Sequence, residues 1–85
     1  GVAYQFAKRA TEVVPEQPIA WLNFGRIADE LYRYDEAENA YARALKLAKA
    51  PEHKLLVLVN WGALLVSKGD WIAAEEVSKK ATRKK

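Results

Sequence analysis

The sequence repeats itself, and this feature constrains the fold more than any other. A shift of 37 residues aligns Leu-Asn-Phe-Gly at 22–25 with Val-Asn-Trp-Gly at 59–62, and a shift of 34 residues aligns Ala3 with Ala37 and Ala10 with Ala44. Self-similarity at a period of roughly 20–50 residues is typical of arrays built from one supersecondary unit. The single domain of 1–85 therefore divides into a half unit and two full units, at 1–15, 18–51 and 52–85.

Each full unit has the pattern of two helices. Between residues 37 and 48, small and apolar residues recur every three or four positions, with charged residues between them, as in an amphipathic helix. Prolines, Gly69 and the potential N-caps Asp35 and Asp70 mark the helix ends. We expect an all-α fold, an α-solenoid of antiparallel helix pairs. Its five helices are predicted at 2–14, 18–33, from 35 to before Pro51, 52–68 and 71–83.

The residues within each unit resemble the tetratricopeptide repeat, whose pattern combines bulky residues with a glycine in the first helix and alanines in the second. The first full unit matches at Trp21, Phe24, Gly25, Ala37, Tyr41 and Ala44, and the second at Leu58, Trp61, Gly62, Leu65, Ala74 and Ala81. Ala28 and Ser78 replace two aromatic positions, and three extra residues stretch the second period. The resemblance covers essentially the whole chain and implies that the helix pairs stack, leaving apolar surface at uncapped ends.

The composition argues against catalysis. The chain has no cysteine and a single histidine, His53, so it offers neither a disulfide framework nor a thiolate metal site. The four glycines are scattered rather than gathered into a phosphate-binding loop, and no nucleophile stands beside a base. We therefore expect no enzyme activity, no metal and no other cofactor, and we interpret His53 as an exposed surface residue.

The net charge of +3 comes from the C-terminal end. Without the five basic residues of that end, nine basic residues face eleven acidic ones. The five are Lys79, Lys80, Arg83, Lys84 and Lys85. Cations suit a helix C-terminus because they meet the negative end of the helix dipole. Nucleic acid is therefore not the partner that we expect, and binding of RNA or an anionic surface by this tail is kept as a third hypothesis.

No apolar run reaches the ~18 residues of a membrane span, and no signal peptide is recognisable at the start. We expect a soluble protein, cytoplasmic by default, since nothing in the sequence specifies its compartment. The absence of methionine suggests that the sequence is a piece of a longer protein.

The resemblance places the first helix of each pair on a concave groove. The expected groove residues are Leu22, Asn23, Arg26, Glu30, Arg33, Leu56, Val59, Asn60, Ala63 and Val66. Asparagine amides both donate and accept hydrogen bonds. Asn23 and Asn60 could therefore hold the main chain of an extended peptide or join neighbouring helices. Residues 55–66 are apolar on nearly every side, whereas packing within the array needs only one apolar stripe. The second stripe is left for a partner, a downstream helix or a second copy of the chain.

We therefore expect a non-catalytic protein–protein interaction module, an adaptor or scaffold that binds a peptide or helix of a partner in the groove. The alternative is self-association into a homodimer through the apolar stripe and the uncapped ends. Some co-chaperones of the family hold acidic tails with a clamp of lysines, asparagines and an arginine. Asn23 matches one clamp residue, but Leu56 and Asn60 stand where the lysine and arginine belong, so heat-shock tail binding is not predicted.

Overall fold

The computed structural model describes residues 1–82, with the backbone alone at 71, 81 and 82. Within this part of the chain five helices follow one another without a strand, which confirms the predicted all-α class. They are α1 (Val2–Val13), α2 (Pro18–Glu30), α3 (Tyr34–Leu47), α4 (Pro51–Lys68) and α5 (Trp71–Thr82). The predicted helix end at Arg83 and the side chain of Ala81 lie outside the described part.

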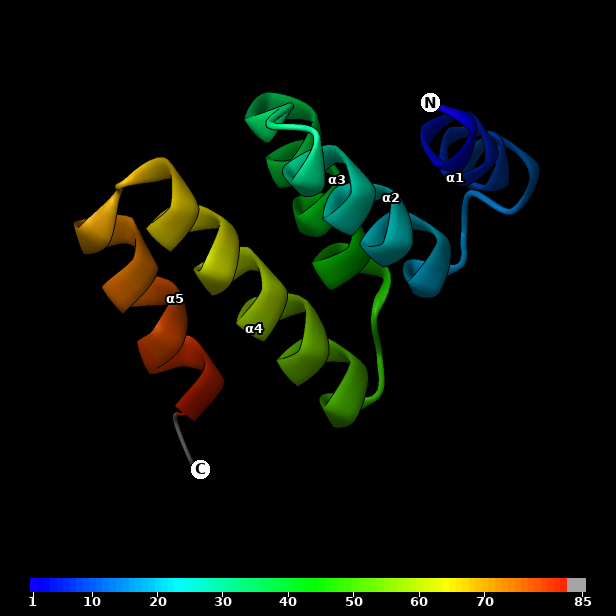
Figure 1. Cartoon of the computed structure of the whole chain (residues 1–85). Helices are drawn as coiled ribbons and strands as arrows, with labels where there is room; N and C mark the ends of the chain where they lie inside the picture. The colour runs from blue at the N-terminus through cyan, green and yellow to red at the C-terminus, as the bar shows by residue number, and fades with distance from the viewer. Residues whose placement is uncertain (83–85) are drawn as a thin grey trace.

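Each helix packs against the next one in the chain (Figure 1), and α2 also contacts α4. The helices therefore form a row of hairpins, 36 × 28 × 13 Å in extent, rather than a bundle around one centre. Stability in such an arrangement comes from the interfaces between neighbouring helices, which explains how a short chain folds without a large core.

The turns confirm some of the predicted helix ends and correct others. Gly69 adopts the left-handed conformation at φ 84°, and the Asp70 carboxylate accepts a hydrogen bond from the Ala73 N–H at 3.2 Å, as expected for a helix stop and an N-cap. The prediction for α2 was wrong by three residues, because Tyr32 takes a positive φ of 63° and turns the chain. The prediction of Asp35 as N-cap was also wrong: the Arg33 carbonyl already accepts from the Ala37 N–H at 3.0 Å, so α3 begins earlier.

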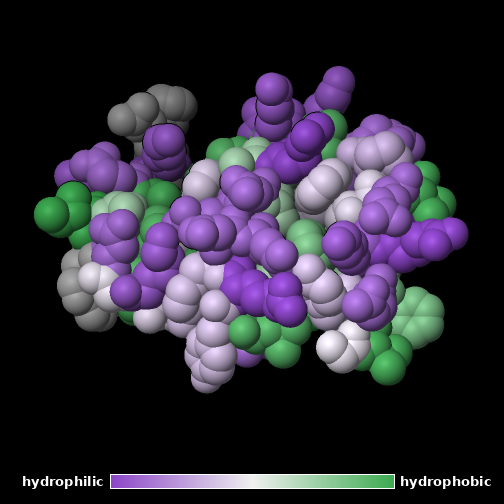
Figure 2. Space-filling view, turned by 90° about the horizontal axis from the view of Figure 1, so that it is seen from above, coloured by the Kyte–Doolittle hydropathy of each residue, from purple (hydrophilic) through white to green (hydrophobic). Residues whose placement is uncertain are grey.

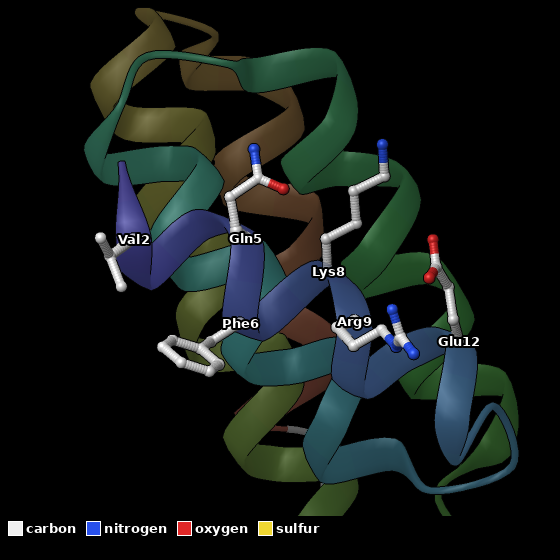
Figure 3. A pocket seen from close by; sticks show the side chains of 6 residues that line it. All are labelled: Val2, Gln5, Phe6, Lys8, Arg9 and Glu12. Atoms are coloured by element: carbon white, nitrogen blue, oxygen red, sulfur yellow. The ribbon is translucent and has the colours of Figure 1, made fainter.

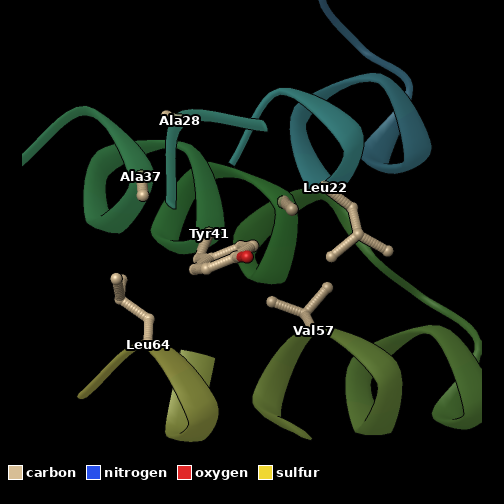
Figure 4. Packing of buried hydrophobic residues seen from close by; sticks show 7 residues of the cluster. Leu22, Ala28, Ala37, Tyr41, Val57 and Leu64 are labelled. Carbon is tan, nitrogen blue, oxygen red and sulfur yellow. The ribbon is translucent and has the colours of Figure 1, made fainter. Parts of the chain in front are cut away.

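The main core lies where α2, α3 and α4 meet (Figure 4). Its buried members are Leu22, Ala28, Ala37, Tyr41, Ala44, Val57 and Leu64. The Tyr41 ring fills the space between the helices, and it lies so close to Gly25 that a Cβ there would be 2.6 Å from Tyr41 Cε1. Gly25 therefore permits the close approach of α2 and α3, whereas a Cβ at Gly62 would meet its nearest neighbour at 3.7 Å.

A second cluster holds α1 against the hairpin of α2 and α3. Tyr4 of α1 packs on Phe24, with ring centroids 5.5 Å apart, and its hydroxyl donates a hydrogen bond to Glu36 Oε1 at 2.8 Å. The Arg33 guanidinium lies 4.7 Å from the centroid of the Tyr4 ring. These contacts set the position of α1 beside α2, and so the shape of the groove between them.

Candidate functional site

An apolar stripe runs along α4 on a side that no helix covers. Leu56, Val59 and Val66 are 44%, 56% and 44% exposed, and Ala63 between them is also exposed. By contrast Val57 and other apolar residues of the same helix are buried. The four exposed residues, called the α4 stripe below, thus form the second apolar face that the sequence predicts, and packing within the described chain does not use it.

Asn60 lies beside the α4 stripe and is partly engaged within its own helix. Its amide nitrogen donates a hydrogen bond to the Leu56 carbonyl oxygen at 2.8 Å. This contact is neither of the two that the sequence suggested, because its partner belongs to the same helix and not to a peptide or a neighbouring helix. The amide oxygen and the second N–H of the amide are the groups with which Asn60 would contact a partner.

Three of the four predicted residues of α2 gather in a groove of ≈ 490 Å³ between α1 and α2. Its lining consists of Ala3, Phe6, Ala7 and Ala10 from α1 and Ala20, Asn23, Arg26, Ile27 and Glu30 from α2. Three of the predicted residues therefore lie together, but the opposite wall of their groove is α1 and not α4. These three residues and the α4 stripe thus belong to two separate surfaces, the α1/α2 groove and the stripe itself, rather than to one groove.

Two of the predicted groove residues lie elsewhere. Leu22 is only 2% exposed, because α4 packs on this side of α2 and encloses it in the core with Tyr41. Arg33 follows the end of α2, lies over the Tyr4 ring and pairs with Glu36 at 3.5 Å. The prediction that Leu22 lines an open groove was wrong, since its side chain belongs to the core, whereas Arg33 is exposed and contacts both α1 and α3.

The outer side of α1 forms an exposed surface, which the sequence predicts only as an uncapped end of the array. Val2, Phe6 and Val13 are 72%, 72% and 65% exposed. Figure 3 shows the six side chains that line a shallow depression of ≈ 500 Å³ on this helix: Val2, Gln5, Phe6, Lys8, Arg9 and Glu12. In Figure 2 hydrophilic side chains cover the middle of one face, and hydrophobic ones appear toward both ends and at the lower edge. The spacing of the exposed apolar residues in α1 could have located this surface from the sequence.

The ionisable groups with shifted pKa values are explained by burial and by their neighbours. Burial, and then the charge of Glu30, raises the pKa of Asp29. Burial also raises the pKa of Tyr41 to about 12, with a smaller contribution from Asp29.

In the described part of the chain no three His, Cys, Asp or Glu side chains come together as a metal site requires. No helix within residues 1–82 has both the length and the apolarity needed to cross a bilayer.

Comparison with protein-family models, with curated proteins and with solved structures gives no match. The resemblance to the tetratricopeptide repeat therefore rests on the residues of this chain alone.

Proposed function

We propose that this chain is a non-catalytic protein-interaction module of the tetratricopeptide-repeat type, which binds a peptide or helix of a partner protein. The observation that carries the proposal is the α4 stripe, whose side chains stay exposed although α4 is packed against its neighbours on other sides. Contiguous exposed apolar surface is costly in water, and on folded proteins it commonly marks an interaction site.

Polar groups at both surfaces, the α4 stripe and the α1/α2 groove, are available to orient a partner. The Asn60 side-chain oxygen can accept a hydrogen bond from a partner N–H group, and Asn23 offers both donor and acceptor at the α1/α2 groove. Arg26 and Glu30 place one charge of each sign beside it. Apolar contact would supply most of the binding free energy, and these polar groups would fix the orientation of the partner.

The test replaces two residues of the α4 stripe. Val59→Ser combined with Val66→Ser removes apolar contact area at exposed positions, so the fold is expected to survive. Ile72→Ser is the matched control, because Ile72 is 78% exposed and lies on α5. Affinity capture quantified by mass spectrometry should show a partner that the wild type and the control retain and that the double variant loses. Equal recovery by all three would refute the assignment of the α4 stripe.

Self-association is the second candidate, favoured by the exposed apolar residues on both α1 and α4. Sedimentation equilibrium distinguishes it, because a homodimer through these surfaces would dissociate in the Val59→Ser, Val66→Ser variant. A wild-type monomer at high concentration would remove this candidate. The RNA or anionic-surface hypothesis depends on the basic residues at 79–85, of which Arg83, Lys84 and Lys85 lie outside the described residues.

A further inference from the structure

A pocket of ≈ 520 Å³ lies at the turn between α2 and α3, where helices of the chain are present on every side of the turn in sequence. Its lining consists of Asp29 and Glu30 from the end of α2, Tyr32 from the turn, Tyr34 from the start of α3 and Ser67 from α4. Figure 1 shows this turn and the C-terminal end of α4 at the same edge of the molecule. The pocket shares no residue with the α4 stripe and only Glu30 with the α1/α2 groove.

Two tyrosine rings line this pocket and stand at a right angle to each other. The ring planes of Tyr32 and Tyr34 meet at 87°, with centroids 6.2 Å apart. A group in the corner between two perpendicular rings lies over both faces, and the face of an aromatic ring attracts cations. Tyr34 packs against the main core, and the Tyr32 N–H donates a hydrogen bond to the Asp29 carbonyl at 2.9 Å, so the packing and the turn hold both rings in place. The Tyr32 ring is 78% exposed, which leaves room for a ligand on it.

The charges around the pocket favour a cation as that ligand. Asp29 and Glu30 occupy the last turn of α2, which has no basic residue, although the negative end of a helix dipole attracts cations. Ser67 brings the same end of α4 to the pocket. The first basic residues that follow these positions in the chain, Arg33 and Lys68, form ion pairs elsewhere, and within residues 1–82 neither pocket carboxylate has an ion-pair partner. Burial, and then the charge of Glu30, raises the pKa of Asp29, as expected of a carboxylate without a cation beside it.

The chain itself shows which cation fits such a set of side chains. Where α1 meets α3, the Arg33 guanidinium lies 4.7 Å from the centroid of the Tyr4 ring and pairs with Glu36 at 3.5 Å. Arg43 lies over Trp21 in a similar way, at 5.3 Å. A planar guanidinium can stack on a ring and still direct N–H groups at its edge toward carboxylates, whereas an ammonium is a more strongly hydrated point charge. The pocket at the α2–α3 turn offers the rings and the carboxylates of the first of these contacts.

We infer that the pocket formed by Asp29, Glu30, Tyr32 and Tyr34 binds the guanidinium group of an arginine side chain from a partner protein. The guanidinium stacks in the corner between the two rings and donates hydrogen bonds to the two carboxylates. The inference rests on the proposed function only in assigning this arginine to a partner protein, and it adds a charged specificity site to the apolar α4 stripe. A small arginine probe binds without touching the stripe, so the two assignments can fail separately.

The probe is arginine blocked as its N-acetyl N-methylamide, which carries the side chain between two peptide bonds. The lysine counterpart keeps the charge without the planar fork, and the citrulline counterpart keeps the shape without the charge. NMR titration of the full chain, followed at the ring protons of Tyr32 and Tyr34, should show saturable binding of the arginine probe, about threefold or more tighter than the lysine probe. The citrulline probe should give no saturable shift. Equal affinities for arginine and lysine, binding of citrulline, or no shift at either ring would overturn the inference.

Variants of the pocket test the two parts of the site. Tyr32→Leu removes the exposed ring and should weaken binding about threefold or more, whereas Tyr32→Phe keeps the ring and should weaken it less. Asp29→Asn combined with Glu30→Gln should weaken binding about tenfold or more. Glu16→Gln combined with Glu52→Gln is the matched control, because it changes the net charge equally at exposed positions outside the pocket.

The stability of the Asp29, Glu30 variant separates binding from a structural role. Carboxylates at the end of a helix are unfavourable, so their neutralisation should not lower the free energy of unfolding, as urea unfolding followed by circular dichroism would show. A loss of stability, unchanged arginine binding in this variant, or an equal loss of binding in the control would contradict the inference. Self-association of the wild type that Tyr32→Leu abolishes would also contradict it, because the arginine would then come from a second copy.

Discussion

The closeness of α2 and α3 at Gly25 makes a quantitative prediction about alanine substitution. In Gly25→Ala the new Cβ would lie 2.6 and 2.7 Å from two ring carbons of Tyr41, against ~3.5–4.0 Å for a relaxed carbon contact. The ring is 1% exposed and belongs to the core, so it cannot move away freely. Overpacking of this kind costs about 1–3 kcal/mol. Higher helix propensity offsets about 1 kcal/mol of this cost.

We therefore expect Gly25→Ala to lower the free energy of unfolding by about 1 kcal/mol. Gly62→Ala is the matched control, because this glycine also lies inside a helix but its Cβ would meet ordinary contacts at 3.7 Å and beyond. It should raise the free energy of unfolding by about 0.5–1 kcal/mol. Urea unfolding followed by circular dichroism measures both variants. Equal stability of Gly25→Ala and Gly62→Ala would mean that the Tyr41 ring does not limit the space at Gly25.

A double-mutant cycle identifies the ring as the cause. Tyr41→Leu removes the aromatic carbons that face Gly25, and a stabilising osmolyte keeps the weakened chain folded during the measurement. In this background Gly25→Ala should no longer destabilise, which gives a coupling free energy of about 1 kcal/mol or more. A penalty that persists without the ring would mean that the backbone of α2, and not its contact with Tyr41, is responsible.

Four further predictions concern single positions. Gly69→Ala should destabilise by about 1–2 kcal/mol in urea unfolding through backbone strain alone, because φ is 84° and nothing lies within 4 Å of the new Cβ. Trp21→Phe should cost about 1 kcal/mol by losing the hydrogen bond from its indole N–H to the Pro15 carbonyl at 2.9 Å. Trp61→Phe should cost clearly less in the same assay, since its buried indole nitrogen has no partner within the described chain. Because burial raises the pKa of Tyr41 from 10.0 to about 12, the unfolded state loses this proton first, and stability should fall between these pH values. Alkaline unfolding curves should show a smaller fall in Tyr41→Phe.

Local signals in the sequence were sufficient to predict most helix ends and the role of the small residues. Gly69 and Asp70 act within one turn of chain, and the spacing of Gly25 from the alanines reflects contacts inside one hairpin. The end of α2 could not be predicted in this way, because Tyr32 adopts a left-handed conformation. Glycine and asparagine are the residues from which this conformation is usually predicted, and tyrosine rarely adopts it.

The candidate site was only partly predictable because it depends on three helices at once. The α4 stripe is visible in the apolar pattern of a single helix, and the sequence therefore predicts it. Whether Leu22 faces solvent or the core depends on the side from which α4 approaches α2, and the helical period does not contain that information.

The affinity of the captured partner for the Val59→Ser, Val66→Ser variant tests the interaction-module account most directly. Val59 and Val66 are about half exposed, so full coverage of both would bury roughly one valine side chain, worth about 1.5–3 kcal/mol. The account predicts that calorimetric titration finds binding weakened about tenfold or more, while Ile72→Ser binds as the wild type does. An unchanged affinity in the folded double variant would contradict the claim that this stripe binds the partner.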